Sequence, residues 1–343
     1  MKGIHESVLM SALRAFFVTF FGVLGISIAL IAIGLTYYGI VSATGEEAFS
    51  SKVKILPDAE GKRKKLGINV PVLLQIDIDG KIGSGKITSA NIEEILLASR
   101  EDAFQDSRVK GVLLVIDSPG GGVNDSDIIY RLVMQYKERY KVPVFAYIDG
   151  LCASGGYYIA CATDKIYASG GSLIGSIGVI SWPPFVNLVD TLEKIGASTL
   201  TLSAGKGKDE MNPFKTWHPG EQDQYQSLIN FYYQRFVDIV SSNRSLPKEN
   251  ITHELGAKVL PAPEALQMGL IDKSDCFRTQ VLADLVKAAG IEGKYQVVGF
   301  ETKSWWKKYL KEEPTSPLIT GKLKHEFSFP SHSDNPCSYI FIP

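Results

Sequence analysis

The chain has 343 residues, 45% of them hydrophobic, which is enough for one large α/β domain with additional segments. A formal net charge of −1 provides no basic field of the kind that binds nucleic acid, so we expect no nucleic-acid partner. The four cysteines, Cys152, Cys161, Cys276 and Cys337, lack the paired spacing of a metal site, and the apolar sequence around the first two favours buried thiols.

The N-terminal part of the chain contains a long uncharged segment. No charged residue lies between Arg14 and Glu46, and the apolar residues 15–41 are numerous enough to span a bilayer as a helix. A cleaved signal peptide is the alternative, but the apolar core of such a peptide is usually about 7–15 residues. Lys2 and Arg14 precede the segment, and positive charge stays on the cytoplasmic side, so we expect the body of the chain outside the cytoplasmic membrane.

The middle of the chain repeats one unit of strand, glycine turn and helix. Residues 70–78 form the first apolar, strand-like run, and Asn91 is positioned to cap the helix after it. Similar strand-like runs occupy residues 111–116 and 142–148, each followed by glycines and a helix-like pattern. Such a series predicts an α/β domain with right-handed crossovers between parallel strands.

The two glycine turns carry the candidate chemistry. The turn after residues 142–148 holds Ser154 between a strand and a helix, where the positive end of the helix dipole lies close to the hydroxyl. Gly155 and, on the preceding turn, Gly121 can each direct a backbone N–H at a developing oxyanion. A tight turn of Ser and Gly without chemistry is the alternative. Neither turn has the lysine or the glycine pattern of a phosphate-binding loop.

Three motifs resemble the signal peptide peptidase A (SppA) family. These are Ser118 to Gly121, Ala153 to Tyr158, and Gly175 to Val179, in that order along the chain. The resemblance covers roughly Leu66 to Asp272 and occurs once, as in the short members of the family. It implies a membrane-bound serine–lysine peptidase with a Clp-protease/crotonase-like α/β fold.

The group that activates Ser154 is the second question. Residues 170–184, where a Clp-type histidine would follow the serine, contain no histidine, and His218 and His253 flank a predicted helix at surface positions. Lys206 and Lys208 lie in a glycine loop after a predicted strand, and a basic side chain there can enter a site.

The family resemblance selects between these lysines and adds a second serine. It implies Lys208 as the general base, because the family lysine falls in a segment like Gly205 to Asp209. It also implies that Ser176 orients the lysine amine, with an ordinary turn serine as the alternative. A lysine base must be neutral, which requires an environment that disfavours the ammonium. Asp209 would oppose this if its carboxylate faced the amine.

The remaining segments complete the predicted organisation. We expect strands at residues 165–168 and 198–202, helices at 186–195 and 221–241, and a loose tail after Pro314. The chain then divides into a cytoplasmic N-terminus (1–14), a transmembrane helix (15–41), a juxtamembrane stalk (42–65), a Clp/crotonase-like peptidase domain (66–300) and a partly disordered C-terminal extension (301–343).

The resemblance implies the following function. Ser154 and Lys208 would cleave remnant signal peptides and other apolar peptides through an acyl-enzyme, without metal or cofactor. The protein would reside in a bacterial cytoplasmic membrane, in contact with lipid, with its catalytic domain on the outer side. It would form a ring of about eight subunits, in which the lysine reaches the serine of a neighbour. A crotonase-type acyl-CoA enzyme and a catalytically inactive membrane scaffold are the alternatives.

Overall fold

A computed structural model describes residues 10, 13–25, 29, 52–63, 65–67, 69–301 and 337–340. The chain divides into two compact units, Met1–Ser50 and Ser51–Pro343. In the first unit residues 13–25 are helical, and most of the predicted transmembrane segment 15–41 lies outside the described residues. Among the helices that the structure describes, none combines the length and the apolar character needed to cross a membrane.

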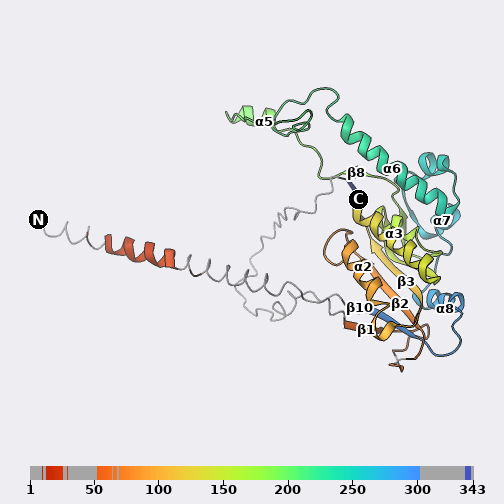
Figure 1. The fold of residues 1–343 in the computed structure, drawn as a ribbon. Helices are drawn as coiled ribbons and strands as arrows, with labels where there is room; N and C mark the ends of the chain where they lie inside the picture. The colour runs from red at the N-terminus through yellow and green to blue at the C-terminus, as the bar shows by residue number, and fades with distance from the viewer. Residues whose placement is uncertain are drawn as a thin grey trace, which may run out of the picture. The chain divides into compact units, whose positions relative to one another are not determined.

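The second unit is built on a mixed sheet of eight strands (Figure 1). The order is β1-β10-β2-β3-β5-β7-β9, and β6 pairs with β5. Pairing is parallel from β10 to β7 and antiparallel at the two edges, β1 with β10 and β7 with β9. The strands are β1 (Lys52–Leu56), β2 (Val72–Asp79), β3 (Val109–Ser118), β5 (Val144–Ala153), β6 (Lys165–Ala168), β7 (Leu173–Gly175), β9 (Val259–Pro261) and β10 (Gln296–Glu301).

Helices connect and cover these strands, so the predicted α/β class is confirmed. Crossovers α2 and α3 link β2 to β3 and β3 to β5, and α4 follows β5 directly. The helices are α2 (Ser89–Ala98), α3 (Val123–Tyr140), α4 (Gly155–Ala160), α5 (Val189–Lys194), α6 (Asp223–Arg244), α7 (Ala262–Gln267) and α8 (Arg278–Ala288), with short helical turns η1 (Asp102–Phe104) and η2 (Asn250–Leu255).

One part of the core lies between α8 and the sheet. Leu113 on β3 and Phe145 on β5 are register partners, and both are buried against α8, which contributes Val281, Leu282 and Leu285. The period-2 alternation of strands presents one set of side chains to this helix. Removing these surfaces from water stabilises the sheet by roughly 25 cal/mol per Å² of buried apolar area.

The N-terminus of α2 differs from its predicted form. Thr88, not Asn91, is the N-cap residue, and its hydroxyl accepts a hydrogen bond from the Asn91 backbone N–H at 3.2 Å. The Asn91 side chain instead donates to the Lys86 carbonyl. The helix begins earlier than predicted because the threonine provides the cap.

A second sheet of three strands lies at the glycine turn after β3. It consists of β4 (Gly120–Gly122), β8 (Ile180–Ser181) and β11 (Cys337–Ile340), with β11 in the middle. Tyr339 is the antiparallel partner of Gly121, and Ser338 is the partner of both Gly122 and Ile180. The predicted glycine turn is therefore a short strand. A strand of the C-terminal extension lies between it and β8.

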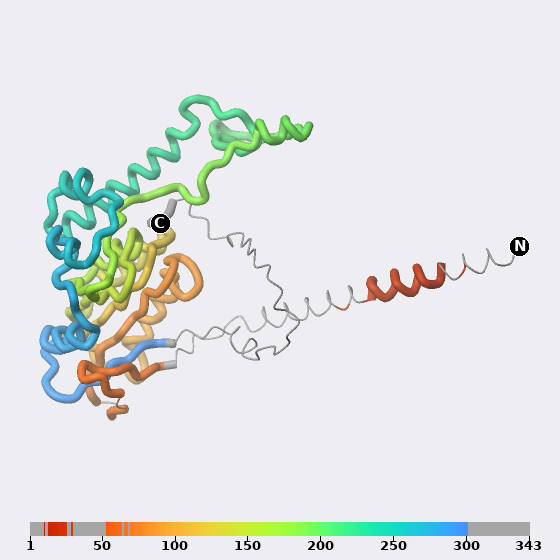
Figure 2. The backbone as a smooth tube through the Cα atoms, turned by 180° about the vertical axis from the view of Figure 1, so that it is seen from behind, coloured from red at the N-terminus to blue at the C-terminus, as the bar shows by residue number. Residues whose placement is uncertain are grey.

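Between β8 and α6 the chain forms an extended excursion, residues 182–222, here called the arm. Figures 1 and 2 both show it reaching away from the sheet, with α5 near its outer end. The predicted strand at residues 198–202 is wrong: the segment is irregular, and Leu200 and Leu202 are 83% and 87% exposed. In the described part of the chain these residues pair with no strand, and a strand needs a neighbour to satisfy its backbone groups.

Candidate active site

Ser154 occupies a sharp turn between β5 and α4. Its φ of 53° and ψ of −117° lie outside the usual regions for a residue with a side chain. Two backbone hydrogen bonds fix this conformation: the Ser154 N–H donates to Gly175 O at 2.8 Å, and the Tyr158 N–H donates to Ser154 O at 2.9 Å. Such strain costs roughly 1–3 kcal/mol and persists where the surroundings enforce it. A strained serine between strand and helix is the geometry of a nucleophile elbow.

The Ser154 side chain is covered in the described part of the chain. The residue has 0% exposed surface, and its Oγ donates a long hydrogen bond of 3.4 Å to Gly178 O. β7 pairs with the end of β5, the chain after β7 brings the Gly178 carbonyl to the Ser154 hydroxyl, and β11 contacts α4.

The strand that carries Gly121 contacts the helix that follows this turn. Ser118, at the end of β3, is the register partner of Cys152 on β5, so the ends of the two parallel strands adjoin. The Ser118 hydroxyl accepts a hydrogen bond from the Gly120 N–H at 3.1 Å and donates to Gly80 O at 2.7 Å, which anchors the start of β4. A Cβ on Gly121 would lie 2.0 Å from Ile82 O, so the strand approaches Ile82 too closely for any side chain.

Gly155 is the first residue of α4. The first N–H groups of a helix have no acceptor within the helix, so they point toward whatever lies at its N-terminus. The structure thus gathers Ser154, Gly155 and the Gly121 strand at the carboxyl ends of two adjacent strands. This is where an open α/β sheet usually carries its site.

Ser176 belongs to the same cluster. The β5–β7 pairing sets Ala153 opposite Gly175, so Ser176 follows directly after the residue that binds the Ser154 amide. Ser176 has a φ of 54°, is 6% exposed, and donates its N–H to Lys258 O at 2.7 Å. A second buried serine therefore lies near the elbow.

Lys208 and Lys206 lie elsewhere, on the arm. Both are exposed, and the Lys208 N–H donates to Gly205 O at 3.3 Å in a local turn. In the described part of the chain no contact joins Lys208 to Ser154 or Ser176. The geometry of one chain does not distinguish the two lysines, and it does not assemble a serine–lysine pair.

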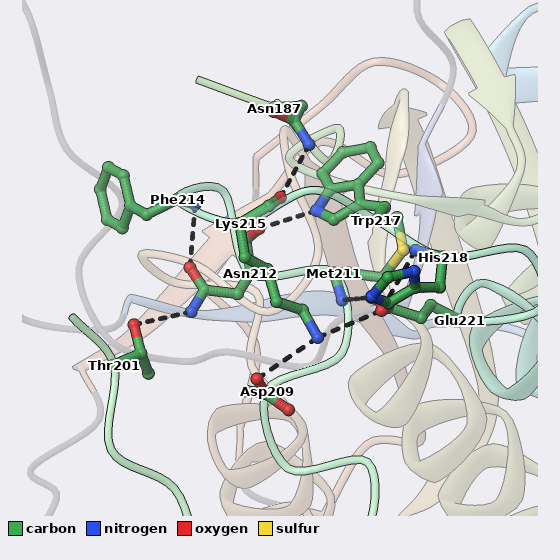
Figure 3. A network of polar contacts seen from close by, with 10 residues as sticks. All are labelled: Asn187, Thr201, Asp209, Met211, Asn212, Phe214, Lys215, Trp217, His218 and Glu221. Atoms are coloured by element: carbon green, nitrogen blue, oxygen red, sulfur yellow. Dashed lines mark hydrogen bonds and ion pairs between the residues drawn. The ribbon is translucent and has the colours of Figure 1, made fainter. Parts of the chain in front are cut away.

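The loop that follows Lys208 is held by a polar network that sequence reasoning missed (Figure 3). The Lys215 ammonium lies 3.3 Å from Asp209 Oδ2 and 3.1 Å from Glu221 Oε1. Burial opposes the charge on Lys215, but hydrogen bonds to Glu221 and Asp209 outweigh it, so the pKa of Lys215 is raised. Only the fold reveals this triad, because its members are six residues apart in the sequence and follow no known motif.

The two cysteines closest to Ser154 in the sequence are excluded as nucleophiles by their surroundings. Cys152 and Cys161 are buried free thiols, as predicted, and burial raises the pKa of Cys161 to about 12 and that of Cys152 well above its usual value. Both therefore stay protonated at neutral pH. His218 and His253 are exposed, as predicted. No cluster of metal-ligating side chains occurs among the residues that the structure describes.

Comparison with known proteins identifies the family. Residues 137–292 match peptidase family S49. The chain is 33% identical to the slr0021 protein of Synechocystis sp. over 219 residues, which is 64% of this chain and 73% of that protein. It is 31% identical to protease 4 of Salmonella typhi over 239 residues, which is 69% of this chain and 36% of that protein. It is 33% identical to the chloroplastic serine protease SPPA of Arabidopsis thaliana over 188 residues, which is 54% of this chain and 27% of that protein.

Coverage of other relatives is partial. The chain spans 54% of the length of a relative from Methanocaldococcus jannaschii and 59% of one from Enterococcus faecium. Among solved structures, a ClpP1 mutant from Listeria monocytogenes matches with a TM-score of 0.40 and 17% identity, covering 62% of this chain and 94% of that one. On the strength of the family match and its relatives, the chain belongs to peptidase family S49, the family of the SppA serine peptidases.

Proposed function

We propose that this protein is a serine peptidase that cleaves extended apolar peptides through an acyl-enzyme. The observation that carries the proposal is the strained elbow at Ser154, in a chain of peptidase family S49. In this proposal Ser154 Oγ attacks the scissile carbonyl, and the Gly121 and Gly155 N–H groups stabilise the oxyanion. One such donor is typically worth about 10²–10³ in kcat.

Lys208 is the proposed general base. Its neutral amine takes the proton from Ser154 Oγ and later delivers it to the leaving amine, and a water molecule then hydrolyses the acyl-enzyme. Ser176 is the proposed partner of the amine, because its hydroxyl can orient a neutral amine without adding charge. Its position beside the residue that holds the Ser154 amide supports this role.

Strand β11 supports an extended peptide as substrate. It forms backbone pairs with β4 on one side and β8 on the other, directly at Gly121. Backbone pairing at a strand edge holds a peptide without regard to its sequence, and side-chain pockets then select. We propose that a substrate takes the place of β11. A crotonase-type acyl-CoA enzyme would use neither this pairing nor a nucleophilic serine.

The exposure of the arm supports a site shared between subunits. Lys208 lies on a segment whose apolar side chains Leu200 and Leu202 are almost fully exposed within one chain. We propose a closed ring of about eight subunits, in which the arm of one chain packs on its neighbour and brings Lys208 to the neighbour's Ser154. Residues 15–41 would anchor each subunit in the bacterial cytoplasmic membrane, with the catalytic domain outside, where remnant signal peptides are available.

Labelling and complementation test the proposal. A serine-directed fluorophosphonate should label the full-length protein in membranes, and Ser154→Ala should abolish labelling and turnover of an apolar peptide. The matched control is Ser84→Ala, which removes an exposed serine outside the cluster. Mixed oligomers of Ser154→Ala and Lys208→Ala chains should regain part of the activity.

Each outcome discriminates between the hypotheses. Labelling that persists in Ser154→Ala refutes the nucleophile, and a well-assembled wild type that turns over no peptide supports the inactive scaffold. Co-assembled mixtures that remain inactive at every ratio would show that the serine and its base come from one chain.

A further inference from the structure

The arm contains one compact ion-pair triad. Lys215 Nζ lies between the carboxylates of Asp209 and Glu221, at 3.3 and 3.1 Å, and Figure 3 shows the three side chains converging. Asp209 is the residue directly after Lys208, the proposed base. The direction of the Asp209 carboxylate is therefore set by a cation six residues further along.

The triad is supported by backbone contacts. Glu221 is 9% exposed, and its two carboxylate oxygens accept hydrogen bonds from the N–H groups of Met211 and His218, both at 3.2 Å. The Asn187 side chain donates to Lys215 O at 3.0 Å, which connects the two limbs of the arm. Glu221 thus fixes Lys215, and Lys215 in turn holds Asp209. The pKa of Glu221 is consistent with these contacts. Burial alone would raise this pKa, but Lys215 and the two N–H groups stabilise the carboxylate more strongly, so the pKa is lowered.

The charge around Lys208 determines whether its amine can act. A carboxylate within about 4–6 Å of an amine stabilises the ammonium form and commonly shifts the titration by 1–3 pH units. The charged residues next to Lys208 along the chain are Lys206, Asp209 and Glu210. The Glu210 carboxylate lies over Gly207, where an added Cβ would be 2.8 Å from Oε1. The other acidic residue beside Lys208 in the sequence is Asp209, and its carboxylate is bound by Lys215.

We infer that Lys215 is a positioning residue of the peptidase: it retains the Asp209 carboxylate and so keeps that charge away from the Lys208 amine. The inference rests on the proposed role of Lys208. Lys215 supplies the cation that Asp209 would otherwise find in Lys208. Asp209 can therefore follow Lys208 in the sequence without stabilising the charged, ammonium form of that lysine.

The test is the pH dependence of kcat/KM for an apolar peptide, measured on the full-length protein. In Lys215→Met the rising part of the pH profile (the ascending limb) should lie about one pH unit higher than in the wild type. The rate at pH 7 should therefore fall about tenfold and recover at alkaline pH. Lys215→Arg should retain the wild-type limb, because a guanidinium also pairs with carboxylates. The double variant Asp209→Asn with Lys215→Met should return the limb toward wild type. Lys194→Met, an exposed lysine of the same arm, is the control.

A purely structural Lys215 would give a different pattern. Its loss would lower the rate equally at all pH values, and Asp209→Asn would not restore it; either result overturns the inference. Asp209→Asn alone gives an independent check. If it moves the ascending limb to lower pH by about one unit, Asp209 already acts on Lys208 in the wild type, and the inference is wrong. If Lys208→Ala retains activity, the proposed base itself is wrong, which this series distinguishes from a failure of Lys215.

Discussion

Gly121 and Gly122 are adjacent in β4 but differ sharply in the space around them. An added Cβ on Gly121 would lie 2.0 Å from Ile82 O and 2.6 Å from two other backbone atoms of Ile82. On Gly122 the nearest atom would be Asp125 Oδ2 at 3.7 Å, an ordinary contact. Gly121→Ala therefore forces β4 and Ile82 apart by more than 1 Å, whereas Gly122→Ala fits.

The cost of this displacement follows from the contacts that it breaks. The Ile82 N–H donates to Gly120 O at 2.9 Å, and the Gly122 N–H donates to Ile82 O at 3.0 Å, on either side of Gly121. Loss of both bonds costs about 1–3 kcal/mol at roughly 0.5–1.5 kcal/mol each. For a domain of this size the melting temperature should fall by about 2–12 °C. Gly122→Ala should cost less than about 1 kcal/mol, the usual loss at an N-cap.

Activity should fall much further than stability. A displacement of about 1 Å at a catalytic group can cost 10²-fold, and removal of an oxyanion donor costs about 10²–10³. We expect kcat for an apolar peptide to drop at least about 100-fold in Gly121→Ala and to stay within about threefold of wild type in Gly122→Ala. Both variants are assayed as folded, full-length protein, with thermal unfolding followed in parallel. A Gly121→Ala protein with wild-type kcat would refute the oxyanion role, and an unchanged melting temperature would refute the close contact with Ile82.

Three further predictions concern the nucleophile, the base and the C-terminal strand. Ser154→Gly should be inactive yet more stable than the inactive Ser154→Ala by about 0.5–2 kcal/mol, because glycine relieves the positive φ at some cost in chain entropy; equal melting temperatures would contradict the strain. Lys208→Arg should be inactive at every pH, since a guanidinium keeps its proton, while Lys206→Ala keeps its activity; the reverse result assigns the base to Lys206. A chain ending at Pro336 lacks β11 and should show a lower KM for peptides, and a synthetic peptide of residues 337–343 should restore the wild-type KM; an unchanged KM would mean that β11 does not compete with substrate.

Local pattern was enough to predict the units of the central sheet. The apolar runs at residues 111–116 and 142–148 became β3 and β5, and the glycine turns after them came together because parallel strands end at one edge. The turn between strand and helix placed Ser154 where the structure has it, between β5 and α4, while its choice as the nucleophile came from the family resemblance, since a plain turn of Ser and Gly was the alternative. The covered thiols at Cys152 and Cys161 followed from their apolar neighbours.

The sequence by itself thus determined which segments become strands and helices and which serine stands at the elbow, since burial period and turn chemistry are local properties. The tertiary structure alone decided what surrounds that serine. Tyr339 meets Gly121 across more than two hundred residues, and the 198–202 segment, strand-like in isolation, has no strand beside it in the described chain. The separation of Lys208 from Ser154 depends on where the arm projects, and the capture of Asp209 by Lys215 depends on how the arm folds on itself. Strand pairing and ion pairing need a partner at the right place in space, and spacing along the chain does not encode that place.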